Sequence, residues 1–284
     1  MRAAVIPGAL FERVRRPRRV PPKEVRRVLV AHHLLLGDTL MLTPLLAKLR
    51  FHHPQADIVM TVARPFAPIY RTRPFGVTAV PFAPHEMRTL APLLDGGGYD
   101  LGVVPGDNRY SWLAMAAGAR WIIAFAGDTP AWKNWPVDEP KPYPNQPAAW
   151  GDMVAELVSG LAPPPFRPTD WPDPECAVFP LPAARRFAVL HVGASTMLKL
   201  WEPDKWRALA LHLEQHAIEP VLLCGRGEEG IVARVDPQGR YTRYAGNLRL
   251  EQVWRLLRAA RSLNMPAPGQ LPIPSCNSAS FSNV

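Results

Sequence analysis

Short apolar runs alternate with amphipathic stretches along most of this chain, and this alternation constrains the fold more than any other feature. The first run, residues 28–32, has the continuous apolar character of a strand that is buried on both faces. Residues 39–50 then place four leucines on one side of a predicted helix. Strands that alternate with helices pair in parallel through right-handed crossovers. The sequence therefore predicts an α/β fold with open, doubly wound parallel sheets.

Proline-rich segments divide this pattern into two parts. Residues 126–148 hold six prolines, which argue against a helix and predict a long surface loop. The prolines of residues 163–183 predict a stiff linker. We expect a Rossmann-like N-terminal domain at 26–162 and a second, partial Rossmann-like domain at 184–261.

Further strands are expected in both domains, at 57–63, 77–82, 101–104, 121–125, 187–192, 220–224 and 241–244. Helices are expected at about 148–159, 203–216 and 250–261, with a short helix from residue 228.

Most of the positive charge lies at the N-terminus. The formal net charge is +9, and residues 1–27 hold nine basic and two acidic side chains. We expect residues 1–25 to be a flexible basic arm outside the fold, which could contact an anionic membrane or nucleic acid; a disordered leader or an overlong start assignment is the alternative. The nearly neutral remainder argues against a nucleic-acid-binding protein.

Several classes of protein and site are disfavoured by missing patterns. No apolar run approaches the ~18 residues of a membrane-spanning helix. Three cysteines without a Cys-x-x-Cys pair indicate a reducing, cytoplasmic setting and no zinc site. The pairs His32-His33 and His52-His53 lack metal-ligand spacing, so we expect no metal. The tryptophans of residues 112–150 are expected to pack in the core and loops.

The loop of residues 32–38 is the first candidate site, because open α/β sheets bind ligands at the carboxyl ends of their strands. Gly37 permits close backbone approach, and Asp38 stands at the start of the following helix. Asp38 is a candidate general base, with helix capping as the structural alternative.

Two loops of the second domain are candidates for binding a nucleotide. The small residues of 193–195 would let a phosphate approach backbone N–H groups, and Lys199 would supply a positive charge, although it could equally be a solvated surface lysine. Residues 224–229 form a glycine-rich turn in which Glu228 suits ribose hydroxyls, but such turns are common.

Together these segments resemble glycosyltransferase family 9, the lipopolysaccharide heptosyltransferases. The matching segments are residues 28–44 with Gly37-Asp38 and Thr43-Pro44, then 99–104, 191–203 and 221–228. The resemblance implies the GT-B fold of two Rossmann-like domains, the first binding the acceptor and the second the nucleotide-sugar. It also implies an inverting, metal-independent transfer of a heptose or related sugar from an ADP-sugar to a lipopolysaccharide core or lipid A acceptor, with no cofactor.

The resemblance also assigns roles to individual residues. Asp38 matches the catalytic base, Ser195, Thr196 and Lys199 match contacts to the donor diphosphate, and Glu228 matches the ribose contact. An anionic lipid acceptor implies a cytoplasmic protein that contacts the inner membrane peripherally. The basic arm and nearby arginines would then meet an anionic surface. These arginines are Arg64, Arg71 and Arg73.

The C-terminus departs from the family pattern. Residues 262–284 contain no charged residue and four prolines, and the family's Asp-[Ser/Thr]-Gly-x-x-His motif is missing. We expect 262–284 to be an aberrant tail left by a truncation or frameshift, so that the second domain is incomplete and poorly stable. The alternative function is an inactive remnant that binds an anionic glycolipid without transferring sugar.

Overall fold

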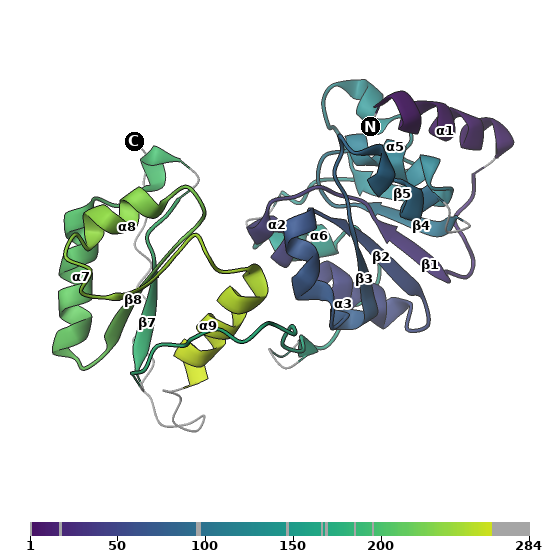
Figure 1. The fold of residues 1–284 in the computed structure, drawn as a ribbon. Helices are drawn as coiled ribbons and strands as arrows, with labels where there is room; N and C mark the ends of the chain where they lie inside the picture. Colours follow the sequence, from purple (N-terminus) through teal and green to yellow (C-terminus); the bar gives the residue numbers. More distant parts are fainter. Residues whose placement is uncertain are drawn as a thin grey trace. The chain divides into compact units, whose positions relative to one another are not determined.

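The computed structural model describes residues 2–16, 19–94, 98–145, 148–165, 167, 170–184, 186–194 and 196–262. The chain divides into two compact units, Met1–Glu175 and Cys176–Val284, which we treat separately (Figure 1). The expected tail lies outside the described residues from 263 onward.

Unit 1 is built on a parallel sheet of six strands in the order β3-β2-β1-β4-β5-β6. Its strands are β1 (Arg27–Val30), β2 (Asp57–Val62), β3 (Val77–Pro81), β4 (Tyr99–Val104), β5 (Ala119–Phe125) and β6 (Glu139–Lys141). Residues 28–30 of the central strand β1 are fully buried, as a strand covered on both faces requires. The predicted parallel α/β sheet is thus confirmed.

The helices of unit 1 cover both faces of this sheet. α1 packs against α5, and α3 packs against α6 (Figure 1). The α-helices are α1 (Arg2–Arg15), α2 (Leu36–Leu40), α3 (Thr43–His52), α4 (Ala91–Leu94), α5 (Arg109–Ala116) and α6 (Trp150–Ala155). Short 3-10 helices lie at η1 (Arg64–Tyr70), η2 (Pro74–Gly76), η3 (Met87–Thr89) and η4 (Ala131–Asn134).

The helix predicted at 39–50 is two helices, α2 and α3. The break falls at Met41 and Leu42, before Thr43 begins α3 with Pro44 in its first turn. Proline has no N–H group to donate to the preceding turn, but the first turn of a helix does not need that donor. Pro44 therefore starts a second helix where leucine spacing alone predicted one continuous helix.

The expectation of a flexible N-terminal arm outside the fold is wrong for residues 2–15, which form α1. Val5 and Ala9, four residues apart on one side of α1, are only 2% and 0% exposed and join the core cluster that includes α5. A Cβ on Gly8 would lie 3.4 Å from the side chain of Ala116 on α5. The expectation of a flexible arm rested on the charge of its arginines, and charge does not predict this apolar contact.

Arginines also fasten the segment after α1 to unit 1. Arg19 donates hydrogen bonds to both carboxylate oxygens of Asp138, at 2.6 and 2.7 Å, and to the carbonyl of Ala119 at 2.9 Å. Arg16 donates to the carbonyl of Gly118 at 3.1 Å. Both arginines are held within unit 1 by these hydrogen bonds, so they do not form a free cationic tail.

The two proline-rich segments are more ordered than expected. Residues 126–148 contain η4 and the edge strand β6. In the second segment, the Trp171 indole packs on Tyr70, with ring centroids 5.0 Å apart, and donates to the carbonyl of Ile69. Prolines prevented α-helices in these segments, but they left 3-10 turns and edge pairing available.

Unit 2 contains a parallel sheet in the order β7-β8-β9. Its elements are β7 (Phe187–His191), η6 (Met197–Lys199), α7 (Pro203–Gln215), β8 (Glu219–Cys224), α8 (Glu229–Val235), β9 (Thr242–Ala245) and α9 (Leu250–Ser262). On β8, Leu222 and Cys224 belong to the core cluster that includes residues of α7 and α8. Val221 and Leu223 belong to a second cluster that includes Leu256 of α9. The sheet is thus covered on both faces.

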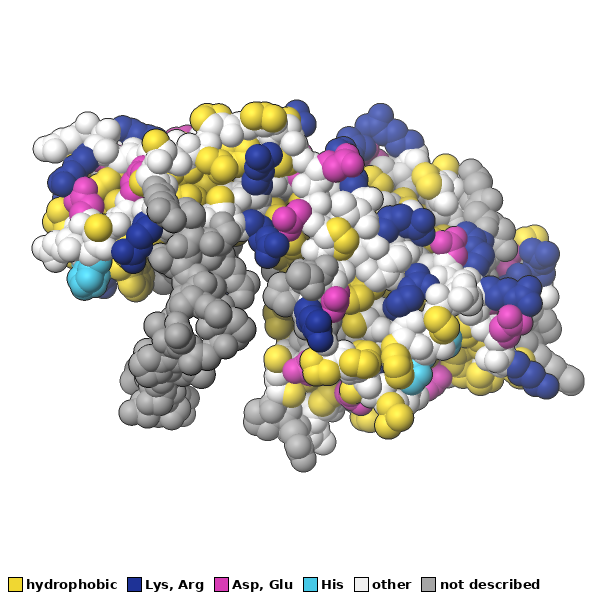
Figure 2. All heavy atoms as spheres, turned by 90° about the horizontal axis from the view of Figure 1, so that it is seen from below, with side chains coloured by type: hydrophobic (Ala, Val, Ile, Leu, Met, Phe, Trp, Pro, Cys, Tyr) yellow, Lys and Arg dark blue, Asp and Glu magenta, His cyan; other side chains and the backbone are white. Residues whose placement is uncertain are grey.

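Charged side chains are dispersed on the face of the molecule drawn in Figure 2. Dark blue Lys and Arg side chains are scattered there, and several lie beside acidic ones. Nucleic-acid binding needs basic groups gathered along one surface, and the coloured residues of this face do not gather in that way. Among the described residues, no helix combines the length and apolarity needed to cross a bilayer.

Candidate functional site

Asp38 lies in the first turn of the short helix α2, after the carboxyl end of β1. Its side chain is half-buried, and the described residues offer it no hydrogen bond or ion pair. The N-cap position is Leu35, and no side chain caps α2. Capping therefore does not explain Asp38, and none of the described residues engages its carboxylate.

Neighbouring groups fix the position of α2. The hydroxyl of Thr39, a buried residue, donates to the carbonyl of Leu35 at 2.8 Å. The Tyr70 hydroxyl donates to the carbonyl of Thr39 at 3.3 Å, which ties α2 to η1. Because these bonds involve the residue next to Asp38, they hold the backbone at Asp38 in one place relative to the sheet.

The buried residue His32 holds the start of the same loop. Its backbone N–H donates to the Thr61 hydroxyl at 2.8 Å, and that hydroxyl donates back to the His32 carbonyl at 2.6 Å. Nδ1 of His32 accepts from the N–H of Leu34 at 3.2 Å, so the neutral ring carries its proton on Nε2. Burial, with a smaller effect of His33, lowers the pKa of His32 to about 3.

His32 should make unit 1 less stable in acid. Its pKa is about 3 in the folded state, below the ordinary value of 6.5, so the unfolded chain binds the proton first as the pH falls. The free energy of unfolding should therefore decline below pH 6.5, by up to about 1.4 kcal/mol per pH unit. We expect urea unfolding of His32→Asn, whose side-chain oxygen can still accept from Leu34, to show a shallower slope between pH 6.5 and 5. Equal slopes would contradict this role.

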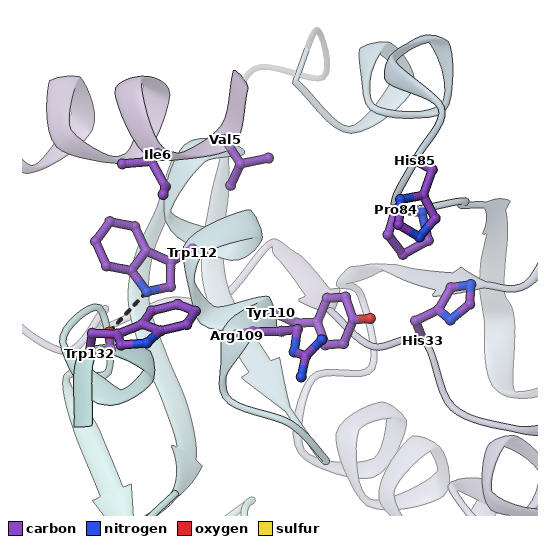
Figure 3. Close-up of a pocket in the computed structure, with 9 residues that line it drawn as sticks. All are labelled: Val5, Ile6, His33, Pro84, His85, Arg109, Tyr110, Trp112 and Trp132. Atoms are coloured by element: carbon purple, nitrogen blue, oxygen red, sulfur yellow. Dashed lines mark hydrogen bonds between the residues drawn. The ribbon is translucent and has the colours of Figure 1, made fainter. Parts of the chain in front are cut away.

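A cavity of about 520 Å³ opens at the same edge of the unit 1 sheet (Figure 3). It is lined by Val5 and Ile6 of α1, His33 after β1, Pro84 and His85 after β3, Arg109, Tyr110 and Trp112 of α5, and Trp132 of η4. These residues come from five separate segments, which is why sequence spacing did not reveal the cavity.

The two ends of this cavity differ in chemistry. At one end, Ile6 points from α1 toward Trp112, whose indole donates to the carbonyl of Trp132 at 3.1 Å (Figure 3). At the other end lie His33 and His85 (Figure 3). Aromatic faces pack on apolar groups, whereas imidazole nitrogens form hydrogen bonds with polar ones. The cavity therefore suits an amphipathic ligand.

A network of polar side chains supports the cavity. Lys133 on η4 is buried, and its Nζ lies 3.2 Å from Asp107 and 3.1 Å from Asp128. Asp107 also pairs with Arg109 at 2.7 Å. Although burial acts to raise the pKa of Asp107, hydrogen bonds from Arg109 and Lys133 outweigh it, so the pKa is lowered. Asp107 remains charged and holds Arg109 at the cavity wall.

In unit 2, the structure brings two predicted loops together around Glu228. The Glu228 carboxylate accepts from the backbone N–H of Gly225 at 2.8 Å. A Cβ on Gly193, in the loop after β7, would clash with the same carboxylate. The Glu228 side chain thus extends from the β8 loop to the β7 loop at Gly193. The predicted residues Gly193 and Glu228 share one site at the carboxyl edge of this sheet.

The other predicted donor residues have different outcomes. Thr196 and Lys199 are exposed, and Thr196 is the N-cap residue of η6. The described residues offer Lys199 no side-chain partner. Ser195 lies outside the described residues. Asp38 belongs to unit 1, whereas Thr196, Lys199 and Glu228 belong to unit 2. Within the described part of the chain, no group of three or more His, Cys, Asp or Glu side chains could hold a metal ion.

A family model identifies the family of this chain, and solved structures share its fold. A model described as glycosyltransferase family 9 (heptosyltransferase) matches residues 87–263. The structure of E. coli heptosyltransferase WaaC with ADP aligns with a TM-score of 0.67 and 19% identity, covering 82% of this chain and 79% of WaaC. No curated protein sequence matches the chain.

Two further solved structures share the fold. The E. coli ADP-heptose lipopolysaccharide heptosyltransferase II aligns with a TM-score of 0.64 and 17% identity, over 82% of this chain and 76% of that one. The family 9 glycosyltransferase of Veillonella parvula DSM 2008 aligns with a TM-score of 0.62 and 15% identity, over 83% and 73%. The fold is therefore of the GT-B type, as the resemblance to family 9 implied.

Proposed function

Because the chain belongs to glycosyltransferase family 9, the heptosyltransferase family, we propose that it transfers a heptose or related sugar from an ADP-sugar to a lipopolysaccharide core or lipid A acceptor. The observation that carries this proposal is the family match, which extends across residues of both units. The acceptor is anchored in the inner membrane, so the reaction takes place at its cytoplasmic face.

Unit 1 supplies the acceptor half of the reaction. The Asp38 carboxylate takes the proton from the acceptor hydroxyl while that oxygen attacks the anomeric carbon of the donor sugar. The new C–O bond forms as the bond from the anomeric carbon to the β-phosphate oxygen of ADP breaks. This single displacement inverts the anomeric centre. A half-buried carboxylate that caps no helix, on a backbone held by Thr39 and Tyr70, supports this role for Asp38.

Unit 2 supplies the donor half. Negative charge develops on the ADP diphosphate as it leaves, and fixed positive groups stabilise that charge. Lys199, with no described side-chain partner, meets the diphosphate together with the backbone around Ser195 and Thr196. Glu228 accepts hydrogen bonds from the ribose hydroxyls. Because Lys199 provides the positive charge, the transfer needs no metal ion.

Titration calorimetry of the full chain with ADP in the presence of EDTA tests the donor half. We expect ADP to bind, and Lys199→Ala to weaken binding about tenfold or more because a charge-assisted contact is lost. Lys205→Ala is the matched control, since Lys205 is another exposed lysine, on α7. No binding of ADP, or equal affinities for the two variants, would contradict the proposed donor site.

A further inference from the structure

We propose that α1 seats unit 1 on an anionic lipid surface. Three apolar side chains on this helix face solvent: Leu10 is 45% exposed, Phe11 67% and Val14 80%. Pro7 is also exposed. The spacing 7, 10, 11 and 14 places all four on one side of the helix, so they form a continuous outer stripe.

This outer stripe lies opposite the face by which α1 joins the fold. Successive helical residues are 100° apart, which puts Val5 and Ala9 about 180° from the centre of the stripe. Val5 and Ala9 are buried in the core cluster that includes α5. A surface helix usually turns polar residues outward and apolar residues toward the core. α1 instead presents apolar residues on both faces, so its outer face suits contact with an apolar medium.

Positive charge on both sides of the outer stripe indicates that the apolar medium is an anionic lipid bilayer. Arg13 flanks it on one side and Arg15 on the other. They pair with the little-exposed carboxylates of Asp138 at 3.9 Å and Glu12 at 3.4 Å, while 39% and 62% of the arginine side chains stay exposed. Arg13 also lies over the ring of Trp135, which is itself 45% exposed. Apolar side chains bordered by arginine and tryptophan are characteristic of helices that lie in the headgroup region of anionic bilayers. A second copy of α1 would instead bring like charges together.

The position of α1 relative to the cavity links this surface to the proposed reaction. Val5 and Ile6, from the same helix, line the cavity of unit 1 (Figure 3). Only α1 therefore separates a bilayer at the outer stripe from the amphipathic cavity. The inference deepens the proposed function, on which it rests only for the lipid nature of the acceptor. Binding to vesicles can be measured without donor or acceptor, so the membrane inference and the proposed sugar transfer can fail separately.

Co-sedimentation of the full chain with vesicles tests the inference. Vesicles of phosphatidylcholine with about one-third phosphatidylglycerol are compared with vesicles of phosphatidylcholine alone. We expect preferential binding to the anionic vesicles, lowered by salt. The variant Phe11→Ser/Val14→Ser should bind at least tenfold more weakly, because it removes the most exposed apolar groups of the outer stripe.

The control variant Leu161→Ser/Val178→Ser removes two apolar side chains that are 79% and 89% exposed elsewhere on the chain. It should bind like the wild type. Equal loss in both variants, unchanged binding of Phe11→Ser/Val14→Ser, or no binding by the wild type would overturn the inference. It would also be overturned if sedimentation equilibrium showed a dimer that this variant dissociates, without vesicle binding, because the outer stripe would then be a self-association surface.

Discussion

Replacing Asp38 by asparagine should lower kcat for sugar transfer by about 10²- to 10⁴-fold, the usual contribution of a general base. Asparagine has nearly the same size but cannot take the acceptor proton. Since Asp38 makes no described hydrogen bond or ion pair, its replacement should leave the melting temperature unchanged. ADP affinity should also be unchanged, because the proposed donor contacts lie in unit 2. Initial rates of ADP release at saturating substrates measure the effect.

Asp152→Asn provides the matched control. Asp152 also lies in the first turn of a short helix, α6, and its side chain is exposed. Its replacement should leave kcat close to the wild-type value. If Asp38→Asn retained wild-type turnover, or if both variants lost activity equally, Asp38 would not be the base.

Replacing Arg19 by alanine should destabilise unit 1 by about 3–5 kcal/mol, the cost of removing one partner of a buried ion pair. The side chains of Arg19 and Asp138 are only 4% and 6% exposed. Without Arg19, Asp138 keeps the backbone N–H of Ile122 at 2.8 Å and the more distant Arg13 at 3.9 Å. The carbonyl of Ala119 also loses a donor. Urea unfolding followed by tryptophan fluorescence measures the loss.

Two comparisons separate this buried pair from a general effect of losing an arginine. Arg26→Ala, whose pair with Glu24 is exposed to solvent, should remain close to wild type. Asp138→Asn in the Arg19→Ala background should recover part of the stability, because it neutralises the carboxylate left without Arg19. A loss of less than about 1 kcal/mol for Arg19→Ala would mean that Arg19 does not fasten the segment after α1.

Strands of both units could be predicted closely from the sequence, because buried parallel strands are continuous apolar runs. The run predicted at 220–224 is β8, Glu219–Cys224. α1 could not be predicted in this way, since Pro7 and Gly8 interrupt its apolar stretch and its contact with the core depends on two small or β-branched residues, Val5 and Ala9. The order of the proline-rich segments was also underestimated. Their 3-10 turns and the packing of Trp171 depend on contacts between residues distant in sequence.

The candidate site was predictable where it follows strand ends. Asp38 in α2, Lys199 in η6 and Glu228 at the N-cap of α8 all follow the carboxyl ends of strands, and this placement depends on local sequence and one topological rule. The cavity of unit 1 was not predictable, because Ile6, His85 and Trp132 meet only after the sheet has formed. The contact of Gly193 with Glu228 likewise required the pairing of β7 with β8.

The most direct test of the central claim is to incubate the full wild-type chain with ADP-heptose and a lipid A-linked core acceptor in EDTA, and to weigh the product by mass spectrometry. The account predicts an acceptor heavier by one heptose, one ADP released for each transfer, and inversion at the anomeric carbon. Release of no ADP and an unchanged acceptor mass, by a chain that still binds an anionic glycolipid, would contradict sugar transfer and identify an inactive binding protein.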